Sequence, residues 1–180
     1  MASTTATDNL RYPIGEFDKS APISAEQRSA NIVAIRDLPA AVEAAVSGLD
    51  DSQMDTEYRP GGWTVRQTVH HIADSHLNSF CRFKLAMTED VPTIRPYAEE
   101  LWAELADSKL AIDSSLAIMR GVHHRLHTLL EAMSENDFAR RLKHPEMGEF
   151  TIEVLLAFYA WHGAHHVAHA GKQAAPKRAA

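Results

Sequence analysis

The C-terminal part of this chain carries a histidine cluster that restricts what it can fold into: His162, His165, His166 and His169. At about 100° per residue in an α-helix, these four imidazoles fall within an arc of roughly 100° on one helical face. Leu155 and Phe158 lie on the same face one to two turns earlier, so the face starts apolar and ends in imidazoles. Imidazoles beside a hydrophobic core have to be neutral and hydrogen-bonded, or bound to a metal, because burying an unpaired charge is costly.

Two of these histidines have the spacing of a metal-binding pair. His162 and His166 are four residues apart, so both can point at one ion, as the two histidines of an H-E-x-x-H helix do. The glutamate of that motif is absent, because position 163 is glycine. Two ligands do not make a specific metal site, so the metal interpretation requires a third ligand from elsewhere. The alternative is a bundle whose histidines are paired to one another without a metal.

The length and composition are those of a single globular domain. The chain has 180 residues, of which 45% are hydrophobic, and this is enough for one substantial core. Its net charge of -6 argues against nucleic acids and anionic membranes as partners, because an acidic surface does not attract them. No run approaches the roughly 20 apolar residues that cross a bilayer, and the N-terminus lacks the pattern of a signal peptide. We therefore expect a cytoplasmic protein.

The cysteine content narrows the choice of metal ligands. Cys81 is the single cysteine, which excludes an intramolecular disulfide and a cysteine zinc cluster. Its neighbours Phe80 and Phe83 favour packing in the core over a role as a nucleophile. A metal would therefore have to be bound by histidine, aspartate or glutamate.

Capping signals followed by apolar stripes predict two helices in the first half of the chain. Ser24–Gln27 has the form of a capping box, and an apolar stripe at helical spacing follows it to Leu49. Pro39 lies within this stripe, where proline can kink or split a helix. Thr64–Gln67 is a second capping box, which opens a helix to about Met87.

The second half of the chain predicts two more helices and no extended sheet. An apolar stripe runs from Leu116 to Met133, and Thr151 can cap the last helix. Residues 143–150 are predicted to form a turn or a short hairpin, and no segment alternates with period two for long enough to make a sheet. The sequence therefore predicts an all-α four-helix bundle over residues 23–170 with long connections, an extended N-terminal arm at 1–22 and a frayed tail at 171–180.

The second predicted helix carries a polar stripe made of His71, Asp74, Asn78 and Arg82. These side chains span about 80° of the helix, with apolar residues on the opposite arc. The stripe is either the solvent-facing side of an amphipathic helix or the wall of a polar cavity inside the bundle. A set of this composition suits metal ligation and oriented hydrogen bonds better than plain solvent. His70 lies nearer the apolar arc and is either a core histidine or the true ligand, and helical geometry alone does not choose.

Four motifs in matching order resemble the YfiT group of the DinB superfamily: Arg59–Gln67 (RPGGWTVRQ), His70–His76 (HHIADSH), Ile94–Tyr97 (IRPY) and Tyr159–His169 (YAWHGAHHVAH). The resemblance covers the chain from about Tyr12 to His169, and the joint match is specific. It implies a four-helix bundle, and it leads us to expect a homodimer because proteins of that group are usually dimers. It also implies one divalent metal ion per chain, bound by three histidines from two helices.

The resemblance implies that the metal ligands are His71, His162 and His166. In that group the first ligand is the histidine followed by two small or apolar residues and aspartate, which corresponds to His71 rather than His70. The other two are the pair already indicated by helical spacing. Three imidazoles leave coordination positions open, as in a catalytic site. Zinc is expected from its abundance, and nickel also suits imidazole ligands.

The function implied by the resemblance is a metal-dependent hydrolase that uses a metal-activated water. Members of the group are also associated with adding bacillithiol-type thiols to electrophiles, so a thiol S-transferase with a metal-bound thiolate is the first alternative. A non-catalytic metal-binding bundle is the second alternative. The expected partner is a small-molecule substrate, which in the transferase includes a low-molecular-weight thiol.

Further residues near the implied ligands are given supporting roles. Those predicted to orient a ligand imidazole or to exchange protons during catalysis are His165, His169 and Asp74. Those predicted to bind a polar or anionic group of the substrate are Asn78, Arg82 and Arg95. On the third helix, His123 lies near the apolar stripe and is predicted to belong to the core.

Overall fold

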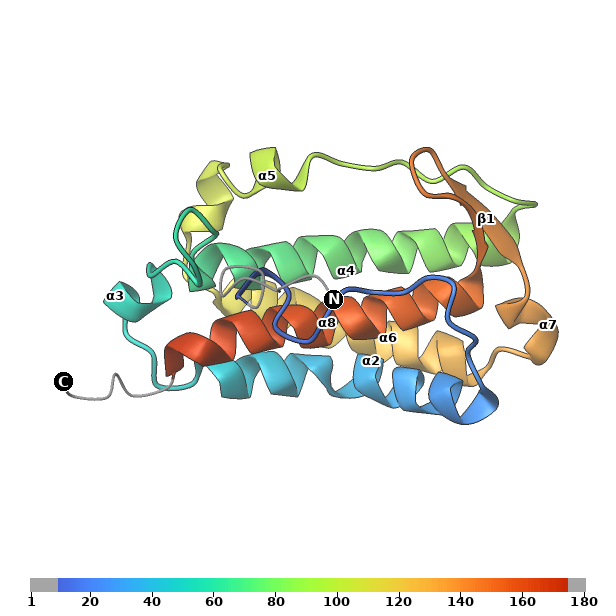
Figure 1. Ribbon diagram of the computed structural model, residues 1–180, viewed down its shortest axis with the longest axis horizontal. Helices are drawn as coiled ribbons and strands as arrows, with labels where there is room; N and C mark the ends of the chain where they lie inside the picture. The colour runs from blue at the N-terminus through green and yellow to red at the C-terminus, as the bar shows by residue number, and fades with distance from the viewer. Residues whose placement is uncertain (1–9, 175–180) are drawn as a thin grey trace, which may run out of the picture.

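Four long helices lie side by side and form the body of the molecule (Figure 1). The computed structural model describes residues 10–174. Its long helices are α2 (Ala25–Val46), α4 (Val65–Thr88), α6 (Asp113–Glu131) and α8 (Ile152–Ala174). Helices α2 and α4 each pack against both α6 and α8, so α2 and α4 occupy opposite corners of the bundle. The predicted all-α four-helix bundle is confirmed.

Short elements occupy the connections between these helices. They are the helices α3 (Asp51–Met54), α5 (Glu99–Trp102) and α7 (Glu135–Phe138), the 3₁₀ helix η1 (Ala106–Lys109), and the strands β1 (Arg141–His144) and β2 (Gly148–Thr151). The two strands pair antiparallel, which confirms the hairpin interpretation of this segment. The connection from α4 to α6 carries α5 and η1 and runs back along α4 (Figure 1).

The starts of α2, α4 and α8 follow from local capping, as the sequence predicted. The Thr64 side chain accepts a hydrogen bond from the Gln67 backbone N–H, and the Gln67 side chain accepts one from the Thr64 N–H. At α8, the Thr151 hydroxyl accepts from the backbone N–H of Val154 at 3.3 Å. Each such cap contributes about 1 kcal/mol. Helix α2 continues through Pro39 and is not split.

The predicted N-terminal arm, residues 1–22, lies along α8 where it is described. The Trp161 indole N–H donates to the backbone carbonyl of Gly15 at 3.2 Å, and the rings of Phe17 and Phe158 meet at 5.4 Å between centroids. Residues 1–9 of this arm and 175–180 of the predicted tail lie outside the described residues, and α8 continues to Ala174. Among the helices described, none combines the length and the apolarity needed to cross a membrane.

Two apolar clusters fill the interior, one toward each end of the bundle. The cluster near the hairpin includes Phe83 of α4 and Leu156 of α8, and the other includes Val69 of α4 and Val42 of α2. Each long helix supplies residues to these clusters. Most of the buried histidines lie between the two clusters along the helices. A polar level therefore crosses the middle of the bundle.

The expectation that Cys81 packs in the core is wrong, because its side chain is exposed on α4. The exposed residues Leu77 and Leu85 lie four residues to either side of it, so all three share one face of the helix. Phe80 and Phe83, which are close to Cys81 in the sequence, point into the core instead, and Phe83 is fully buried.

Gly163 explains why α8 carries no glutamate between His162 and His166. A Cβ atom at this position would lie 2.6 Å from Cδ2 of Leu38, because α8 packs closely against α2 here. Leu38 is itself buried, at 6% exposure, which limits its movement. A side chain at position 163 would have to displace the buried side chain of Leu38.

We expect Gly163→Val to lower the free energy of unfolding by about 1–3 kcal/mol, the usual result of overpacking a core. Urea denaturation of the metal-free protein measures this. Gly121→Val on α6 is the matched control, because a Cβ at Gly121 meets nothing within 4 Å. If both valine variants change stability equally, close packing of α8 on α2 is not the cause. In a Leu38→Ala background the Gly163→Val substitution should be far less damaging.

Candidate metal centre

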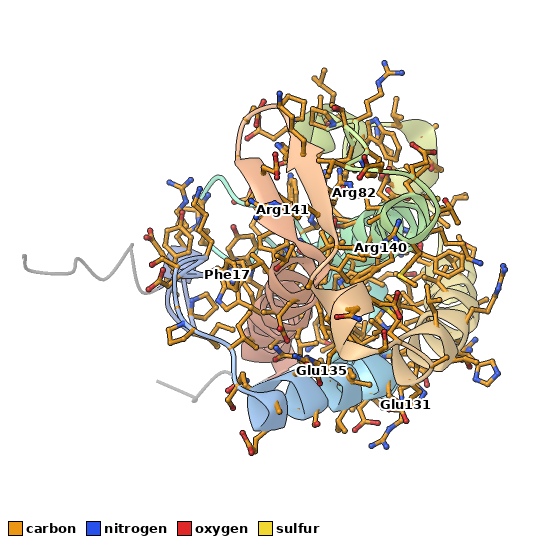
Figure 2. All side chains as sticks on the ribbon, turned by 90° about the vertical axis from the view of Figure 1, so that its right-hand side faces the viewer. Phe17, Arg82, Glu131, Glu135, Arg140 and Arg141 are labelled. Carbon is orange, nitrogen blue, oxygen red and sulfur yellow. The ribbon has the colours of Figure 1, made fainter. Side chains whose placement is uncertain are left out.

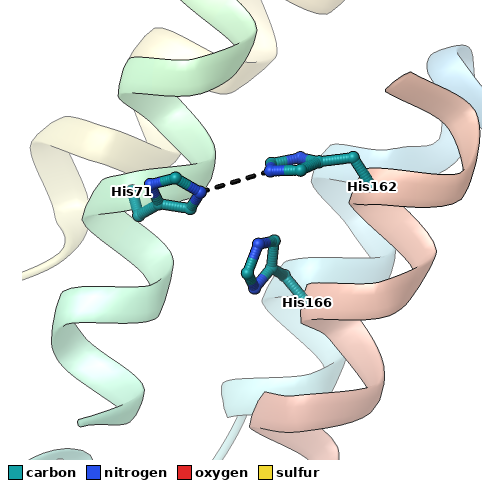
Figure 3. A group of neighbouring side chains, drawn as sticks. All are labelled: His71, His162 and His166. Atoms are coloured by element: carbon teal, nitrogen blue, oxygen red, sulfur yellow. Dashed lines mark hydrogen bonds between the residues drawn. The ribbon is translucent and has the colours of Figure 1, made fainter. Parts of the chain in front are cut away.

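Three imidazoles from two helices converge in the polar level of the bundle (Figure 3). His71 belongs to α4, and His162 and His166 belong to α8, one helical turn apart. Nitrogen atoms of all three lie within 4.8 Å of one another, and Nε2 of His71 lies 3.2 Å from Nε2 of His162. The fold therefore brings together the three residues predicted as metal ligands.

The spacing of these nitrogen atoms suits a single divalent ion. Two imidazole nitrogens bound at about 2.0–2.1 Å to tetrahedral zinc lie about 3.3–3.4 Å from each other, close to the 3.2 Å between His71 and His162. His71, His162 and His166 are each 8% exposed, so the surrounding protein restricts their rings. Three nitrogen ligands leave coordination positions for water or substrate, as in catalytic sites.

Burial keeps the three imidazoles neutral. Removal from water lowers the pKa of His71 to about 4, and the neighbouring His165 adds a smaller effect in the same direction. Burial also holds the pKa of His162 and His166 well below the ordinary value, again with smaller contributions from nearby histidines. A neutral imidazole presents a lone pair, so the three residues have the protonation state that binds a cation at neutral pH.

Trp63 covers one side of the candidate centre. It lies in the turn just before α4, and its ring centroid is 4.5 Å from that of His71 and 6.3 Å from that of His166. The cap at Thr64 fixes where α4 begins and therefore where this ring is held. An indole against two of the imidazoles excludes water from that side.

His70 is buried with both ring nitrogens in hydrogen bonds, which favours the core interpretation over a ligand role. Its Nδ1 lies 2.7 Å from the Ser115 hydroxyl, and its Nε2 lies 3.1 Å from the backbone carbonyl oxygen of Leu110. Since the carbonyl only accepts, Nε2 carries the proton and Nδ1 accepts from Ser115. Both ring nitrogens are occupied, so of the two adjacent histidines it is His71 that faces α8.

A second group on α8 also has nitrogen atoms within 4.8 Å of one another: His165, His166 and His169. The His165 ring stacks on Trp161 at 4.7 Å between centroids. The His169 ring stacks on Tyr58 at 3.9 Å, and its Nε2 lies 3.2 Å from the backbone carbonyl oxygen of Arg11. The contacts of His169 with Tyr58 and Arg11 show that this part of α8 is covered by the segments that contain these two residues. The predicted catalytic role of His165 and His169 stays a prediction.

Asp74 lies one helical turn beyond His71 on the same face of α4. Its carboxyl is half-buried, and burial together with the nearby Asp107 raises its pKa, while His70 acts in the opposite direction. A carboxyl with a raised pKa suits proton exchange. The described hydrogen bonds include none from this carboxylate to the three imidazoles, so its catalytic role also stays a prediction.

A cavity of about 460 Å³ lies where the α4–α6 connection passes over α4. Its lining residues are Asn78, Arg95, Pro96, Tyr97, Ala98 and Trp102. Two of the three residues predicted to bind substrate therefore share one cavity. Asn78 is held there by its side-chain amide, which donates to the backbone carbonyl of Asp74 at 2.9 Å.

Arg82, the third predicted substrate-binding residue, lies between α4 and the hairpin (Figure 2) and outside the lining of this cavity. Its guanidinium donates to the Tyr159 hydroxyl at 2.6 Å and to the backbone carbonyl of Arg95 at 3.1 Å. No carboxylate lies within ion-pair distance of it in the part of the chain that the structure describes. Its charge is therefore available to an anionic group.

Sequence reasoning missed two fully buried residues, His76 and Tyr159, and the half-buried Tyr97. His76 is fully buried on α4, and its Nε2 lies 3.3 Å from Nδ1 of His162. The hydroxyl groups of Tyr97 and Tyr159 both approach Ser75, and burial raises the pKa of each phenol. A histidine on the apolar side of a helix was a signal that could have identified His76, because such a side chain needs a partner inside the protein.

The comparisons with known proteins agree with this architecture. A family model described as the DinB superfamily matches residues 34–170. The chain belongs to the DinB superfamily. The motifs that resembled this superfamily therefore identified it correctly, and the matched range includes all three candidate ligands.

Relatives within the DinB superfamily carry names that refer to metal. A Bacillus cereus protein named "Putative metal-dependent hydrolase" is 51% identical over 90% of this chain and 94% of its own length. A Bacillus thuringiensis protein with that name has the same identity and coverage. The structure of YfiT from Bacillus subtilis, titled "a probable metal-dependent hydrolase with an unusual four-helix bundle topology", matches with a TM-score of 0.88 and 47% identity. The match covers 92% of this chain and 96% of that one.

Proposed function

We propose that this chain is a metal-dependent hydrolase whose divalent ion is bound by His71, His162 and His166. The observation that carries the proposal is the convergence of three buried, neutral imidazoles from two helices at a spacing that fits one ion. The names of its relatives support metal dependence. When bound, an ion with open coordination positions supplies a water that is nucleophilic near neutral pH, with zinc or nickel as the metal.

The surrounding side chains control access and protons at this centre. Trp63 shields the imidazoles from solvent on one side. Asp74, with its raised pKa and its place one turn from His71, is positioned to take up and return a proton. Tyr97 keeps its phenolic proton because burial raises its pKa, so it can donate a hydrogen bond to a substrate oxygen.

The substrate we propose is a small molecule with a polar or anionic group. Arg95 and Asn78 offer hydrogen-bond donors in the cavity over α4, and the nearby charge of Arg82 lacks a carboxylate partner among the described residues. The rings of Tyr97 and Trp102 lie 4.5 Å apart between centroids, tilted at 46°, and both line this cavity. The homodimer and the cytoplasmic location stay predictions.

Thiol S-transfer is the second candidate function. An ion held by the three imidazoles would keep open coordination positions, which accept a thiol as well as water. The observation that favours it is the uncompensated charge of Arg82 close to Arg95, which suits the carboxylates of a low-molecular-weight thiol.

One assay separates the candidates. Protein purified without a histidine tag is stripped of metal, reloaded with zinc or nickel, and given chromogenic esters and amides. A parallel assay uses a chromogenic electrophile with cysteine, glutathione or bacillithiol. We expect ester or amide cleavage that requires the metal and is lost in His166→Ala.

The alternatives give different results in the same assay. Metal-dependent conjugation of a thiol without cleavage would replace hydrolysis by S-transfer. Stoichiometric metal binding with neither reaction would favour the non-catalytic bundle. Absence of metal binding by the wild-type protein would overturn the proposal, since each of these functions requires the ion.

A further inference from the structure

A row of buried imidazoles leads from the candidate metal centre across the bundle to α2. Nδ1 of His162 lies 3.3 Å from Nε2 of His76, which belongs to α4. The His76 ring stacks on His123 of α6, with 4.8 Å between centroids and 26° between planes. Nδ1 of His123 lies 2.5 Å from the backbone carbonyl oxygen of Ile35 on α2. His76 is 0% exposed and His123 is 1% exposed, so these two rings have no access to bulk water.

Pro39 makes the Ile35 carbonyl available at the far end of this row. In an uninterrupted helix the N–H of residue 39 would donate to the carbonyl of residue 35, but proline has no N–H. A buried carbonyl needs a donor, and His123 provides it from the neighbouring helix. Because a carbonyl only accepts, the proton of His123 is on Nδ1, and its Nε2 is unprotonated when the ring is neutral.

At the end of the row next to the candidate centre, the hydrogen bond between His162 and His76 determines which nitrogen of His162 carries the proton. A nitrogen that binds a metal is unprotonated, so Nε2 of His162 must carry no proton and Nδ1 must carry it. That proton can be donated only if Nε2 of His76 accepts it. If His76 instead carried its proton on Nε2, His162 would have to hold its own proton on the nitrogen that faces His71, and this would block an ion.

We propose that His76 is a positioning residue of the metal centre, which accepts the Nδ1 proton of His162 and so directs the Nε2 lone pair toward His71 and His166. His123, anchored by the carbonyl that Pro39 leaves free, holds the His76 ring in place by stacking. This inference rests on the proposed function in one respect, that an ion binds the three histidines. His76 acts through His162 and does not itself contact the ion.

The first test compares two substitutions of His76. His76→Phe keeps a flat ring of similar size but cannot accept a hydrogen bond, whereas His76→Gln retains an acceptor oxygen. We expect His76→Phe to weaken zinc binding by about 10–100-fold, the usual effect of removing a partner of a ligand histidine, and His76→Gln to restore most of the affinity. Chelator competition measures zinc affinity, and the visible absorption of the cobalt(II)-loaded protein reports the ligand geometry.

His70→Phe is the matched control. It makes the same change on the same helix and removes two hydrogen bonds, but His70 faces Ser115 and Leu110. We expect it to lower thermal stability while leaving zinc affinity and the cobalt spectrum unchanged. Wild-type zinc affinity in His76→Phe would overturn the role of His76 and leave the proposed function intact, whereas a wild-type protein that binds no metal would overturn the proposed function itself.

A measurement on the zinc-loaded wild-type protein keeps the inference testable if His76→Phe does not fold. Nitrogen NMR of the imidazoles should show a protonated Nδ1 on His162 with a coupling across the hydrogen bond to Nε2 of His76. It should also show the proton of His123 on Nδ1. A His162 ring whose Nδ1 proton exchanges freely and shows no such coupling would overturn the inference.

The anchor at Pro39 has a separate test in thermal unfolding. His123→Phe leaves the Ile35 carbonyl without its hydrogen-bond donor and should lower the midpoint temperature of thermal unfolding. Adding Pro39→Ala supplies the missing backbone N–H, so the double variant should recover part of the loss. If Pro39→Ala lowers the midpoint equally in both backgrounds, the two residues are not linked through this carbonyl.

Discussion

His162→Ala is expected to weaken zinc or nickel binding by more than about 100-fold and to remove stoichiometric metal from the purified protein. Loss of a hydrogen-bond partner of a ligand already costs about 10–100-fold, and loss of the ligand itself costs more. With His162 absent, His71 and His166 remain as two ligands on different helices, too few for a specific site. Metal analysis of tag-free protein and chelator competition provide the measurement.

His165→Ala serves as the control for this variant and decides between the two histidine groups on α8. It should retain metal if the ion is bound by His71, His162 and His166. The reverse result, in which His165→Ala loses the metal and His162→Ala keeps it, would assign the ion to His165, His166 and His169. His166→Ala should lose the metal in either case, because His166 belongs to both groups.

The metal-free protein is expected to lose several kcal/mol of stability between about pH 6.5 and pH 4. Burial lowers the pKa of His71 to about 4, and it lowers the pKa of His76, His162 and His166 as well. In the unfolded chain these groups bind protons near pH 6.5, so below that pH the unfolded state takes up more protons than the folded one. The free energy of unfolding therefore has its full value above about pH 6.5, where the groups are neutral in both states. It falls as the pH falls toward 4. His71 alone accounts for about 3 kcal/mol at about 1.4 kcal/mol per pKa unit.

Urea denaturation of metal-free protein at pH 7 and pH 4.5 measures this loss. His71→Asn should show a smaller difference between the two pH values, because it removes one of the buried groups that must be kept neutral. Equal stability of the wild-type protein at both values would mean that these imidazoles are hydrated or paired in the folded state. A difference unchanged in His71→Asn would assign the effect to other groups.

The parts of the fold that depend on neighbouring residues could be predicted from the sequence. Helix starts at Ser24, Thr64 and Thr151 were readable because a cap involves residues only three positions apart. The pair His162 and His166 was readable for the same reason, since one helical turn separates them. These features need no knowledge of which helices become neighbours.

Choices that depend on a partner from another helix could not be made in this way. His70 and His71 are adjacent, and what separates them is that His70 meets Ser115 and Leu110 while His71 meets α8. Family resemblance pointed to His71, the residue that the structure places opposite His162, because the motif carries tertiary information that periodicity lacks. Cys81 was misplaced because neighbours in the sequence point to different sides of a helix.

Because His71 and His162 lie on different helices, an ion bound by both would be a reversible cross-link. The two residues are 91 positions apart along the chain, and a link that closes a loop of this length restricts the unfolded chain by about 4–5 kcal/mol. Metal affinity would then add to folding stability, as it does in small metal-dependent domains. A shortage of the metal in the cell would then shorten the lifetime of the protein as well as inactivate it. The supply of the ion would therefore set both the amount of protein that persists and the fraction that is active.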